Sequence, residues 1–168
     1  VDMGVTFADD SIPGVDLIFP DPGFILDKKD DLLGIVLTHA HEDHIGAVAH
    51  IWPSLKCKMY ATPFTAALIY EKFKEKKIDI TSYLKIVPLN SKIKLGSFEI
   101  DFVTLTHSIL EPNGLSITTP LGTILHTGDW KIDPNPLIGG SVDEKKLKKI
   151  GEKGVSVMIC DSTNIFSP

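Results

Sequence analysis

The chain has 168 residues, of which 43% are hydrophobic and 23% charged, and its net charge is −5. These proportions are ordinary for one globular domain with a core of its own. The apolar runs are all too short to cross a membrane, so we expect no membrane partner. The negative charge argues mildly against nucleic-acid binding. The sequence contains no repeat and no low-complexity tract.

Short apolar runs alternate with helical stretches along the chain. Runs that are rich in Val, Ile and Phe, and that Gly, Pro or Asn punctuates, predict β-strands. The predicted strands are Asp16–Phe19, Gly34–Leu37, Lys58–Ala61, Leu84–Pro88, Phe98–Leu105, Leu115–Thr119, Thr123–His126 and Val155–Cys160. The stretches 92–95 and 98–102, on either side of Gly96 and Ser97, predict a hairpin.

Three helices are predicted between these strands. The first is Asp43–Ile51, which we expect to stop before Pro53. The second is Pro63–Lys76, with Thr62 as its N-cap and a lysine-rich last turn that suits the helix dipole. The third, Glu144–Lys149, is short and lysine-rich, and we expect it to be exposed. Helices and strands mixed in this way predict an α/β layered fold with a mixed sheet.

The two cysteines, Cys57 and Cys160, each lie in an apolar β-like run, and neither belongs to a CxxC pair. We expect two buried thiols in a reducing, cytoplasmic compartment, rather than a disulfide or metal ligands. No signal peptide is visible. The chain starts at Val1 with VDMG, which resembles the end of a strand, and it stops in a loop, DSTNIFSP. We therefore expect it to be a piece of a longer protein.

Residues 39–44, HAHEDH, hold three histidines and two acids in six positions. They follow a predicted buried strand and precede a helix, a place where α/β proteins usually have their sites. His39 and His41 can point the same way from an extended segment, whereas Asp43 and His44 point in two directions from the first helical turn. Two groups of imidazole and carboxylate ligands favour two ions of Zn, Mn or Fe. The alternative is a polar loop whose histidines bind nothing.

Two ions need further ligands, and the ends of two later strands supply candidates. His107 follows the predicted strand Phe98–Leu105. Asp129 comes soon after the run 123–125, and Gly128 would permit a tight turn that aims its carboxylate inward, where it could bridge two ions. The alternatives are a hydrogen-bonded core histidine and a simple turn aspartate.

Three more residues near these candidates have other predicted roles. Glu42 points away if its neighbours converge, so we expect it either to support a ligand or to be exposed. His50 comes late on the first helix, where an exposed or capping role is expected. His126 ends a strand, and we expect it to be structural or to support a ligand.

Together these stretches resemble the metallo-β-lactamase-fold hydrolases. The features are HAHEDH followed by IGA, then THS and then TGDW, in this order at the ends of predicted strands. The resemblance implies an αββα sandwich, here partial, and a pair of metal ions, usually zinc. The stretches VDMGVTFADDSIPGVD, HAHEDHIGA, ATPFTAALI, THSI, HTGDWKID and DSTN further resemble ribonuclease J along essentially the whole chain. Ribonuclease J is a bacterial metallo-β-lactamase/β-CASP nuclease with 5′-to-3′ exonuclease and endonuclease activity on RNA.

The resemblance also implies roles for individual residues. One ion would be held by His39, His41, His107 and Asp129, and the other by Asp43, His44 and Asp129. Asp43 is also expected to accept a proton from the attacking water. The loop residues Ser162, Thr163 and Asn164 could donate to a substrate phosphate, and the alternative is a polar turn that ends a strand. The family has a further ligand histidine and a β-CASP domain downstream, so residues 1–168 are expected to form a partial metallo-β-lactamase domain.

The predicted function is therefore hydrolysis of RNA phosphodiesters by a water that two divalent metal ions activate, with Zn expected and Mn as the alternative. RNA is the predicted partner, and a basic groove for it would need local lysines such as Lys131 or parts outside this chain. A homo-oligomer is left open for the whole protein. The alternatives are a thioesterase, lactonase or β-lactamase of the same fold that acts on a small molecule, and a metal-binding fragment without activity.

Overall fold

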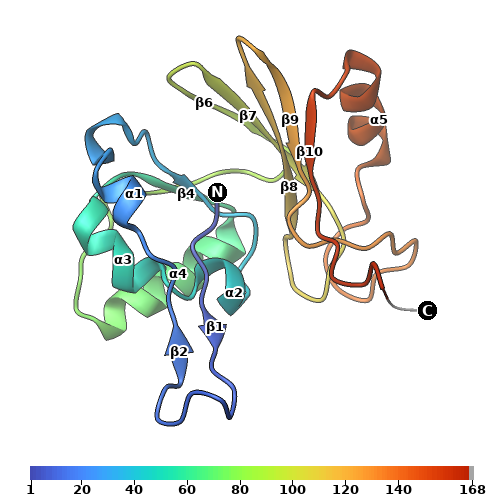
Figure 1. The fold of residues 1–168 in the computed structure, drawn as a ribbon. Helices are drawn as coiled ribbons and strands as arrows, with labels where there is room; N and C mark the ends of the chain where they lie inside the picture. Colours follow the sequence, from blue (N-terminus) through green and yellow to red (C-terminus); the bar gives the residue numbers. More distant parts are fainter. Residues whose placement is uncertain (167–168) are drawn as a thin grey trace. The chain divides into compact units, whose positions relative to one another are not determined.

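The computed structural model describes residues 1–166. The chain divides into two compact units, which we call unit 1 (Val1–Val87) and unit 2 (from Pro88 onward). Figure 1 shows unit 1 in blue to green and unit 2 in yellow-green to red. Each unit has its own β-sheet and its own helices, so each is described by itself.

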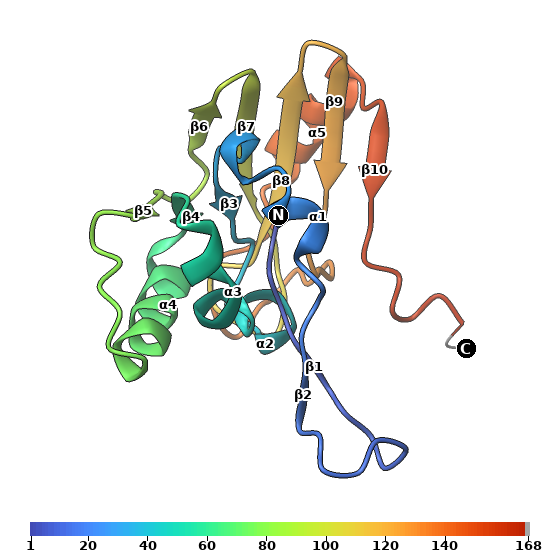
Figure 2. The same ribbon diagram turned by 60° about the vertical axis from the view of Figure 1, so that its left-hand side comes forward.

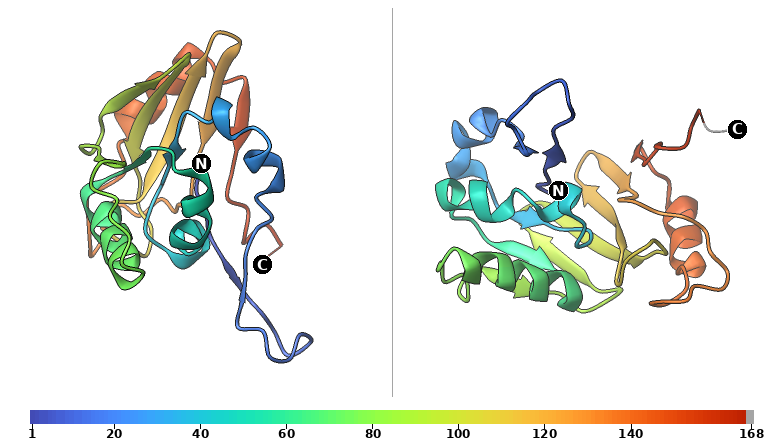
Figure 3. Two further views of the ribbon diagram at one scale, coloured as in Figure 1. Left: turned by 90° about the vertical axis from the view of Figure 1, so that its left-hand side faces the viewer. Right: turned by 90° about the horizontal axis from the view of Figure 1, so that it is seen from below.

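Unit 1 is built on a three-stranded parallel sheet. The strands are β3 (Ile35–Val36), β4 (Met59–Ala61) and β5 (Leu84–Ile86), which lie in this order. The helices between them are α2 (Glu42–Ile45), α3 (Val48–Leu55) and α4 (Pro63–Glu75). Figure 3 shows α3 and α4, in teal and green, side by side. Leu37, Met59, Ile69 and Phe73 are fully buried between the strands and the helices and form the core of this unit.

The N-terminal part of unit 1 forms an arm that the sequence only partly predicted. Strands β1 (Thr6–Phe7) and β2 (Leu17–Ile18) pair in antiparallel fashion. Short helix α1 (Gly23–Leu26) and a 3₁₀ turn (Lys29–Asp31) follow them. Figure 2 shows the hairpin extending from the rest of unit 1. The predicted strand around residue 17 is confirmed, whereas β1 and α1 had no clear signal in the sequence.

The prediction of one helix, Asp43–Ile51, that stops before Pro53 is wrong in two respects. The backbone forms two helices, because α2 ends at Ile45 and α3 begins at Val48. Helix α3 then continues through Pro53 to Leu55. A proline inside a helix removes a backbone hydrogen bond. That cost is offset because Trp52 and Leu55, on either side of it, are buried, and each such side chain contributes roughly 1.5–3 kcal/mol.

Helix α4 agrees with its prediction to within one residue at its end. Thr62 occupies the expected N-cap position in an extended conformation, but its side chain makes no capping hydrogen bond. Pro63 stands at the first helical position, and Lys72 and Lys74 lie in the last turn, as the sequence indicates. The fully buried Phe73 contacts the Trp52 ring edge-on, with ring centroids 5.3 Å apart. This contact joins α4 to α3.

Unit 2 contains a five-stranded mixed sheet, as the sequence predicts for the fold class. Its strands are β6 (Lys92–Leu95), β7 (Phe98–Thr104), β8 (Asn113–Thr119), β9 (Gly122–His126) and β10 (Val157–Ile159). The order in the sheet is β10-β9-β8-β7-β6, and all neighbours are antiparallel except β10 and β9. Gly96 has a φ of 57° in the predicted hairpin between β6 and β7, a conformation that glycine adopts easily.

Helix α5 (Glu144–Lys153) lies behind this sheet in Figure 2 and is one turn longer than predicted. Its Ile150 packs against Val103 and Leu105. Lys146 pairs with Asp101 at 2.6 Å. The helix was expected to be exposed, but the face with Ile150 and Lys146 packs on the sheet. Lysines on its other face remain exposed.

Both cysteines are free thiols, as the sequence predicts, but neither is fully buried. Cys57 is half-buried, and Cys160 is exposed because it follows β10, which lies at the edge of the sheet. The expectation of two buried thiols is therefore wrong. Among residues 1–166, no helix is both long enough and apolar enough to span a membrane.

Candidate metal centre

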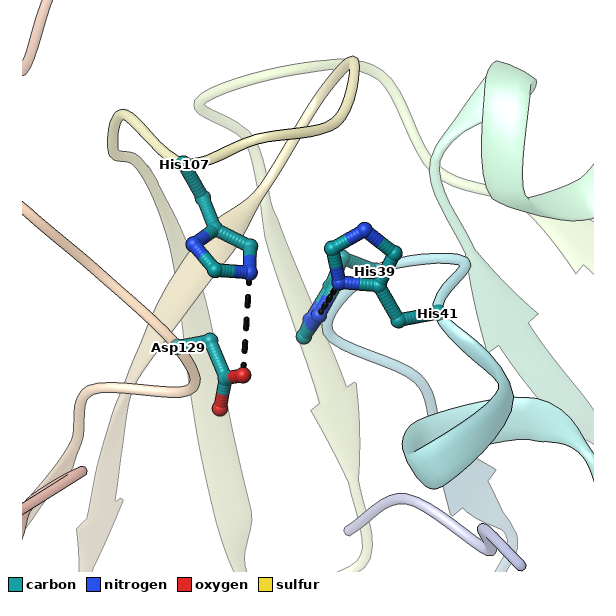
Figure 4. Close-up of side chains that lie close together, drawn as sticks. All are labelled: His39, His41, His107 and Asp129. Atoms are coloured by element: carbon teal, nitrogen blue, oxygen red, sulfur yellow. Dashed lines mark hydrogen bonds and ion pairs between the residues drawn. The ribbon is translucent and has the colours of Figure 1, made fainter. Parts of the chain in front are cut away.

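Four side chains of unit 1 gather where the segment after β3 enters helix α2. We call His39, His41, Asp43 and His44 the α2 cluster. His39 is fully buried and Asp43 is exposed, whereas His41 and His44 are half-buried. His39 Nε2 lies 3.2 Å from His41 Nδ1 (Figure 4). His44 Nε2 lies 3.7 Å from Asp43 Oδ2. His39 and His41 thus point the same way, as the sequence predicts. Asp43 and His44 were expected to point in two directions, but their side chains lie beside one another.

Two histidines of the α2 cluster are held by polar groups on the other side of the ring. Thr38 Oγ1 lies 3.0 Å from His39 Nδ1, and Asp2 Oδ2 lies 2.7 Å from His44 Nδ1. Asp2 also accepts hydrogen bonds from the Thr38 backbone N–H and hydroxyl, both at 2.8 Å. With these bonds, the Nε2 atom of His39 lies beside His41, and that of His44 lies beside Asp43. Partners of this kind fix the tautomer and the orientation of metal-binding histidines.

Asp2 is a partner of the α2 cluster that the sequence did not reveal. Burial acts to raise the pKa of its carboxyl, but the hydrogen bonds from His44 and Thr38 outweigh it, so the pKa lies below its ordinary value of 3.8. Asp2 is therefore an ionised acceptor that suits a histidine N–H donor. The only signal in the sequence was an acid within VDMG, which gave no indication of a partner 42 residues away.

Residues 2–5 also hold helix α2 through backbone hydrogen bonds. Met3 N donates to His44 O at 2.7 Å, and Val5 N donates to Glu42 O at 3.1 Å. The approach requires glycine at position 4, since a Cβ on Gly4 would lie 1.7 Å from the Asp43 carbonyl oxygen. The backbone that carries the candidate ligands is thus fixed from the N-terminal side.

Glu42 points away from the α2 cluster, as the sequence predicts. Its Oε1 lies 2.5 Å from Lys72 Nζ on helix α4, and half of its side chain is exposed. Among residues 1–166, Glu42 does not belong to a group of side chains that could hold a metal ion. It ties α2 to α4.

His50 is exposed, as expected, and lies outside the α2 cluster. Its ring centroid is 4.6 Å from that of Phe19, and Lys76 Nζ is 3.4 Å from its Nδ1. Desolvation and the charges of Lys76 and Lys72 hold the pKa of His50 below its ordinary value of 6.5. Because His50 is neutral and belongs to neither group of candidate ligands, a His50 variant is a matched control for variants of the candidate ligand histidines.

Unit 2 carries the other two candidate ligands, His107 and Asp129, which we call the loop cluster. His107 follows β7 and Asp129 follows β9, and His107 Nε2 lies 3.6 Å from Asp129 Oδ2 (Figure 4). Gly128 has a φ of 58°, which supplies the predicted tight turn. The backbone N–H of Gly128 donates to His126 Nδ1 at 3.1 Å. His126 therefore shapes the turn that presents Asp129, a structural role that the sequence favoured.

The loop that follows β10, residues 160–165, has its own local hydrogen bonds, and we call it the closing loop. Asp161 accepts from the Thr163 hydroxyl at 2.7 Å and from its backbone N–H at 2.9 Å. These bonds, followed by one from the Trp130 backbone, hold the pKa of Asp161 below its ordinary value of 3.8. Ser162 Oγ donates to the Cys160 carbonyl at 3.3 Å. The loop lines a pocket of about 310 Å³ together with Trp130, and Asn164 also lies on its wall.

Comparison with known proteins gives the class of this chain. The Beta-lactamase superfamily domain family matches residues 13–147, which is most of the chain. The chain therefore belongs to this family, and the expected metallo-β-lactamase fold is confirmed. A solved structure from Enterococcus faecalis V583, described as a protein of unknown function, covers 99% of this chain and 44% of that chain, with a TM-score of 0.64 and 19% identity. A likeness at this identity shows the fold alone.

The curated relatives point to a narrower group within this class. The chain is 45% identical over 166 residues to Ribonuclease J of Sinorhizobium meliloti, covering 98% of this chain and 29% of that protein. It is 42% identical over 165 residues to Ribonuclease J of Helicobacter pylori, covering 98% and 24%. It is 36% identical over 170 residues to Ribonuclease J of Synechocystis, covering 100% and 27%. The predicted resemblance to ribonuclease J is confirmed, and the chain spans less than a third of these relatives.

Proposed function

We propose that the protein is a metal-dependent ribonuclease that hydrolyses RNA phosphodiesters. The observation that carries this proposal is the 45% identity to a Ribonuclease J over 98% of the chain. The chain spans 29% of that relative, so the activity of the whole protein is part of the proposal. The α2 cluster and the loop cluster support it, because both offer the imidazole and carboxylate atoms that divalent ions accept.

The proposed centre joins the two clusters around two divalent ions, with Zn expected and Mn as the alternative. One ion would be held by His39, His41, His107 and Asp129, and the other by Asp43, His44 and Asp129. The orientation of His39 by Thr38 and of His44 by Asp2 supports this assignment, because only one ring nitrogen of each then faces the ligands. Asp129 would contribute to both, because its carboxylate offers two oxygens.

Two such ions, when bound, lower the pKa of a shared water toward neutrality and offset the charge that builds on phosphoryl oxygens. The side chain of Asp43 is 63% exposed, and its Oδ2 lies beside His44. We propose that this carboxylate accepts the proton that the water loses as it adds to phosphorus. Asp2 and Thr38 keep the imidazoles in place, so the ligands need no reorientation during the reaction.

Contacts to the substrate are proposed at the closing loop. Ser162, Thr163 and Asn164 carry hydroxyl and amide groups that suit phosphate oxygens. The Ser162 and Thr163 hydroxyls already donate within the loop, so Asn164 is the strongest donor candidate of the three. With a net charge of −5, the chain has no general attraction for RNA. Binding is therefore proposed to depend on the metal centre and on local groups such as Lys131, although Asp133 lies 3.5 Å from its Nζ.

The test compares three substrates with the metal-loaded protein: a 5′-monophosphorylated single-stranded RNA, a thioester and a β-lactam. We expect cleavage of the RNA alone, and loss of cleavage in a His41→Ala variant. A His50→Ala variant, which removes a histidine outside both clusters, should keep the activity. Hydrolysis of the thioester or the lactam without cleavage of RNA would favour a small-molecule hydrolase of the same fold. Cleavage that survives His41→Ala would place the reaction elsewhere.

A further inference from the structure

Thr106 connects the two loops that carry His107 and Asp129. It lies two residues after the end of strand β7 and is 2% exposed. Its hydroxyl donates a hydrogen bond to the Lys131 carbonyl and accepts one from the Asp133 backbone N–H at 3.2 Å. The Lys131 backbone N–H in turn donates to the Thr106 carbonyl at 2.9 Å. Thr106 and Lys131 thus form an antiparallel bridge outside the main sheet.

These bonds matter for the candidate ligands because the bonded residues are their neighbours in the sequence. Thr106 immediately precedes His107, and Lys131 comes two residues after Asp129. Every bond of the bridge therefore joins the loop of one candidate ligand to the loop of the other. The backbone bond fixes one point of contact, and the hydroxyl adds two more bonds to the 131–133 segment. Together, the three hydrogen bonds fix the direction of the 131–133 segment and its distance from Thr106.

We propose that Thr106 is a positioning residue, which sets His107 and Asp129 relative to one another for metal binding. This inference rests on the proposed metal-dependent function. A binding site must hold its ligands to within roughly 0.5 Å of the productive geometry, and loops alone seldom do so. Only a hydroxyl can both donate to Lys131 and accept from Asp133 at this position, because an aliphatic side chain does neither.

The chain offers a matched control two residues away. Thr104, at the end of β7, is 8% exposed, and its buried hydroxyl makes no hydrogen bond within the described part of the chain. Thr104→Val and Thr106→Val exchange the same hydroxyl for the same methyl group. Only Thr106→Val deprives the Lys131 carbonyl and the Asp133 backbone N–H of the hydroxyl that they bond. Thr106→Ser keeps the hydroxyl and loses only a methyl group.

The experiment measures the affinity of the protein for Zn²⁺ in competition with a chelator, and the unfolding temperature of the metal-free protein. We expect Thr106→Val to weaken the affinity about 10- to 100-fold, the usual effect of removing a group that orients a ligand. Thr104→Val and Thr106→Ser should keep the wild-type affinity. A change in overall stability alone would not produce this pattern, because the affinity is measured well below the unfolding temperature of every variant.

Three outcomes would overturn the inference, and they are distinguishable. If the wild-type protein binds Zn²⁺ and Thr106→Val binds it equally well, the positioning role is wrong and the proposed metal centre stands. If the wild-type protein binds no Zn²⁺, the proposed function fails, and the positioning role fails with it. Loss of affinity in Thr104→Val to the same extent as in Thr106→Val would also contradict the inference, since any buried threonine would then have the same effect.

Discussion

Replacement of Asp2 by asparagine should disturb the α2 cluster without changing its shape. The amide oxygen can keep the hydrogen bond from the Thr38 backbone N–H, which now goes to Oδ1 at 2.8 Å. The amide nitrogen then takes the place of Oδ2, which lies 2.7 Å from His44 Nδ1. Because that nitrogen donates, the imidazole proton of His44 must move to Nε2. Nε2 is the atom turned toward Asp43, so the variant blocks the proposed ligand atom.

The size of the effect follows from the bonds that are lost. A hydrogen bond to a charged group contributes roughly 1.5–3 kcal/mol, so we expect the free energy of unfolding to fall by about that amount. Loss of a carboxylate that orients a metal-binding histidine weakens metal affinity about 10- to 100-fold. The effect of the variant can therefore be distinguished from a simple loss of stability, because its metal affinity falls even where the protein remains folded.

The assay combines urea unfolding of the metal-free protein, Zn²⁺ titration and ¹⁵N NMR of the His44 ring. Asp10→Asn, which neutralises an exposed carboxylate on the N-terminal arm, is the control and should match the wild type in all three. Asp2→Asn should shift the proton of His44 from Nδ1 to Nε2. Unchanged Zn²⁺ affinity together with an unchanged tautomer would refute the role assigned to Asp2.

Two further predictions follow from local geometry. Gly46→Ala should lower the free energy of unfolding, although alanine usually gains about 1 kcal/mol over glycine in a helix, because its Cβ would lie 2.5 Å from the Glu42 carbonyl oxygen. Gly151→Ala in α5 meets no atom within 4 Å and should stabilise the protein, by about 0.5–1 kcal/mol; urea unfolding of both variants checks the opposite signs. The hydrogen bond from Lys92 at 2.6 Å holds the pKa of Glu99 below 4.5, so its stabilising effect is present above pH 4.5 and is lost as the pH falls through the lowered pKa. NMR titration should show the Glu99 midpoint return toward 4.5 in Lys92→Met, and an unchanged midpoint would exclude the pair in solution.

Local patterns in the sequence predicted much of the site. HAHEDH follows a buried strand and enters a helix, as the structure has it, and His39 lies beside His41 as expected. Asp43 and His44, which were expected to point in two directions, instead lie beside one another. The turn at Gly128 was also predicted, because glycine there permits a positive φ. These features depend on residues that are near one another in the chain. Their role as metal ligands stays a prediction.

Long-range contacts were beyond such reasoning. Asp2 reaches His44 across 42 positions, and Thr106 reaches Asp133 across 27, with no periodicity to reveal either pair. The break between α2 and α3 has a similar origin, since residues 2–5 hydrogen-bond to α2 from outside the helix. Pro53 was read as a helix stop, but burial of Trp52 carries the helix past it. In each case tertiary packing decided what local propensity left open.

The most direct test of the account is the metal content of the protein, measured by elemental analysis after purification without chelator. About two divalent ions per chain are expected in the wild type, because the proposed ligands form two groups that could each hold an ion. Variants that remove one ligand from each cluster, His41→Ala and His107→Ala, should each contain less metal, and His50→Ala should match the wild type. A wild-type protein without bound metal, or one whose metal content is indifferent to His41 and His107, would contradict the account.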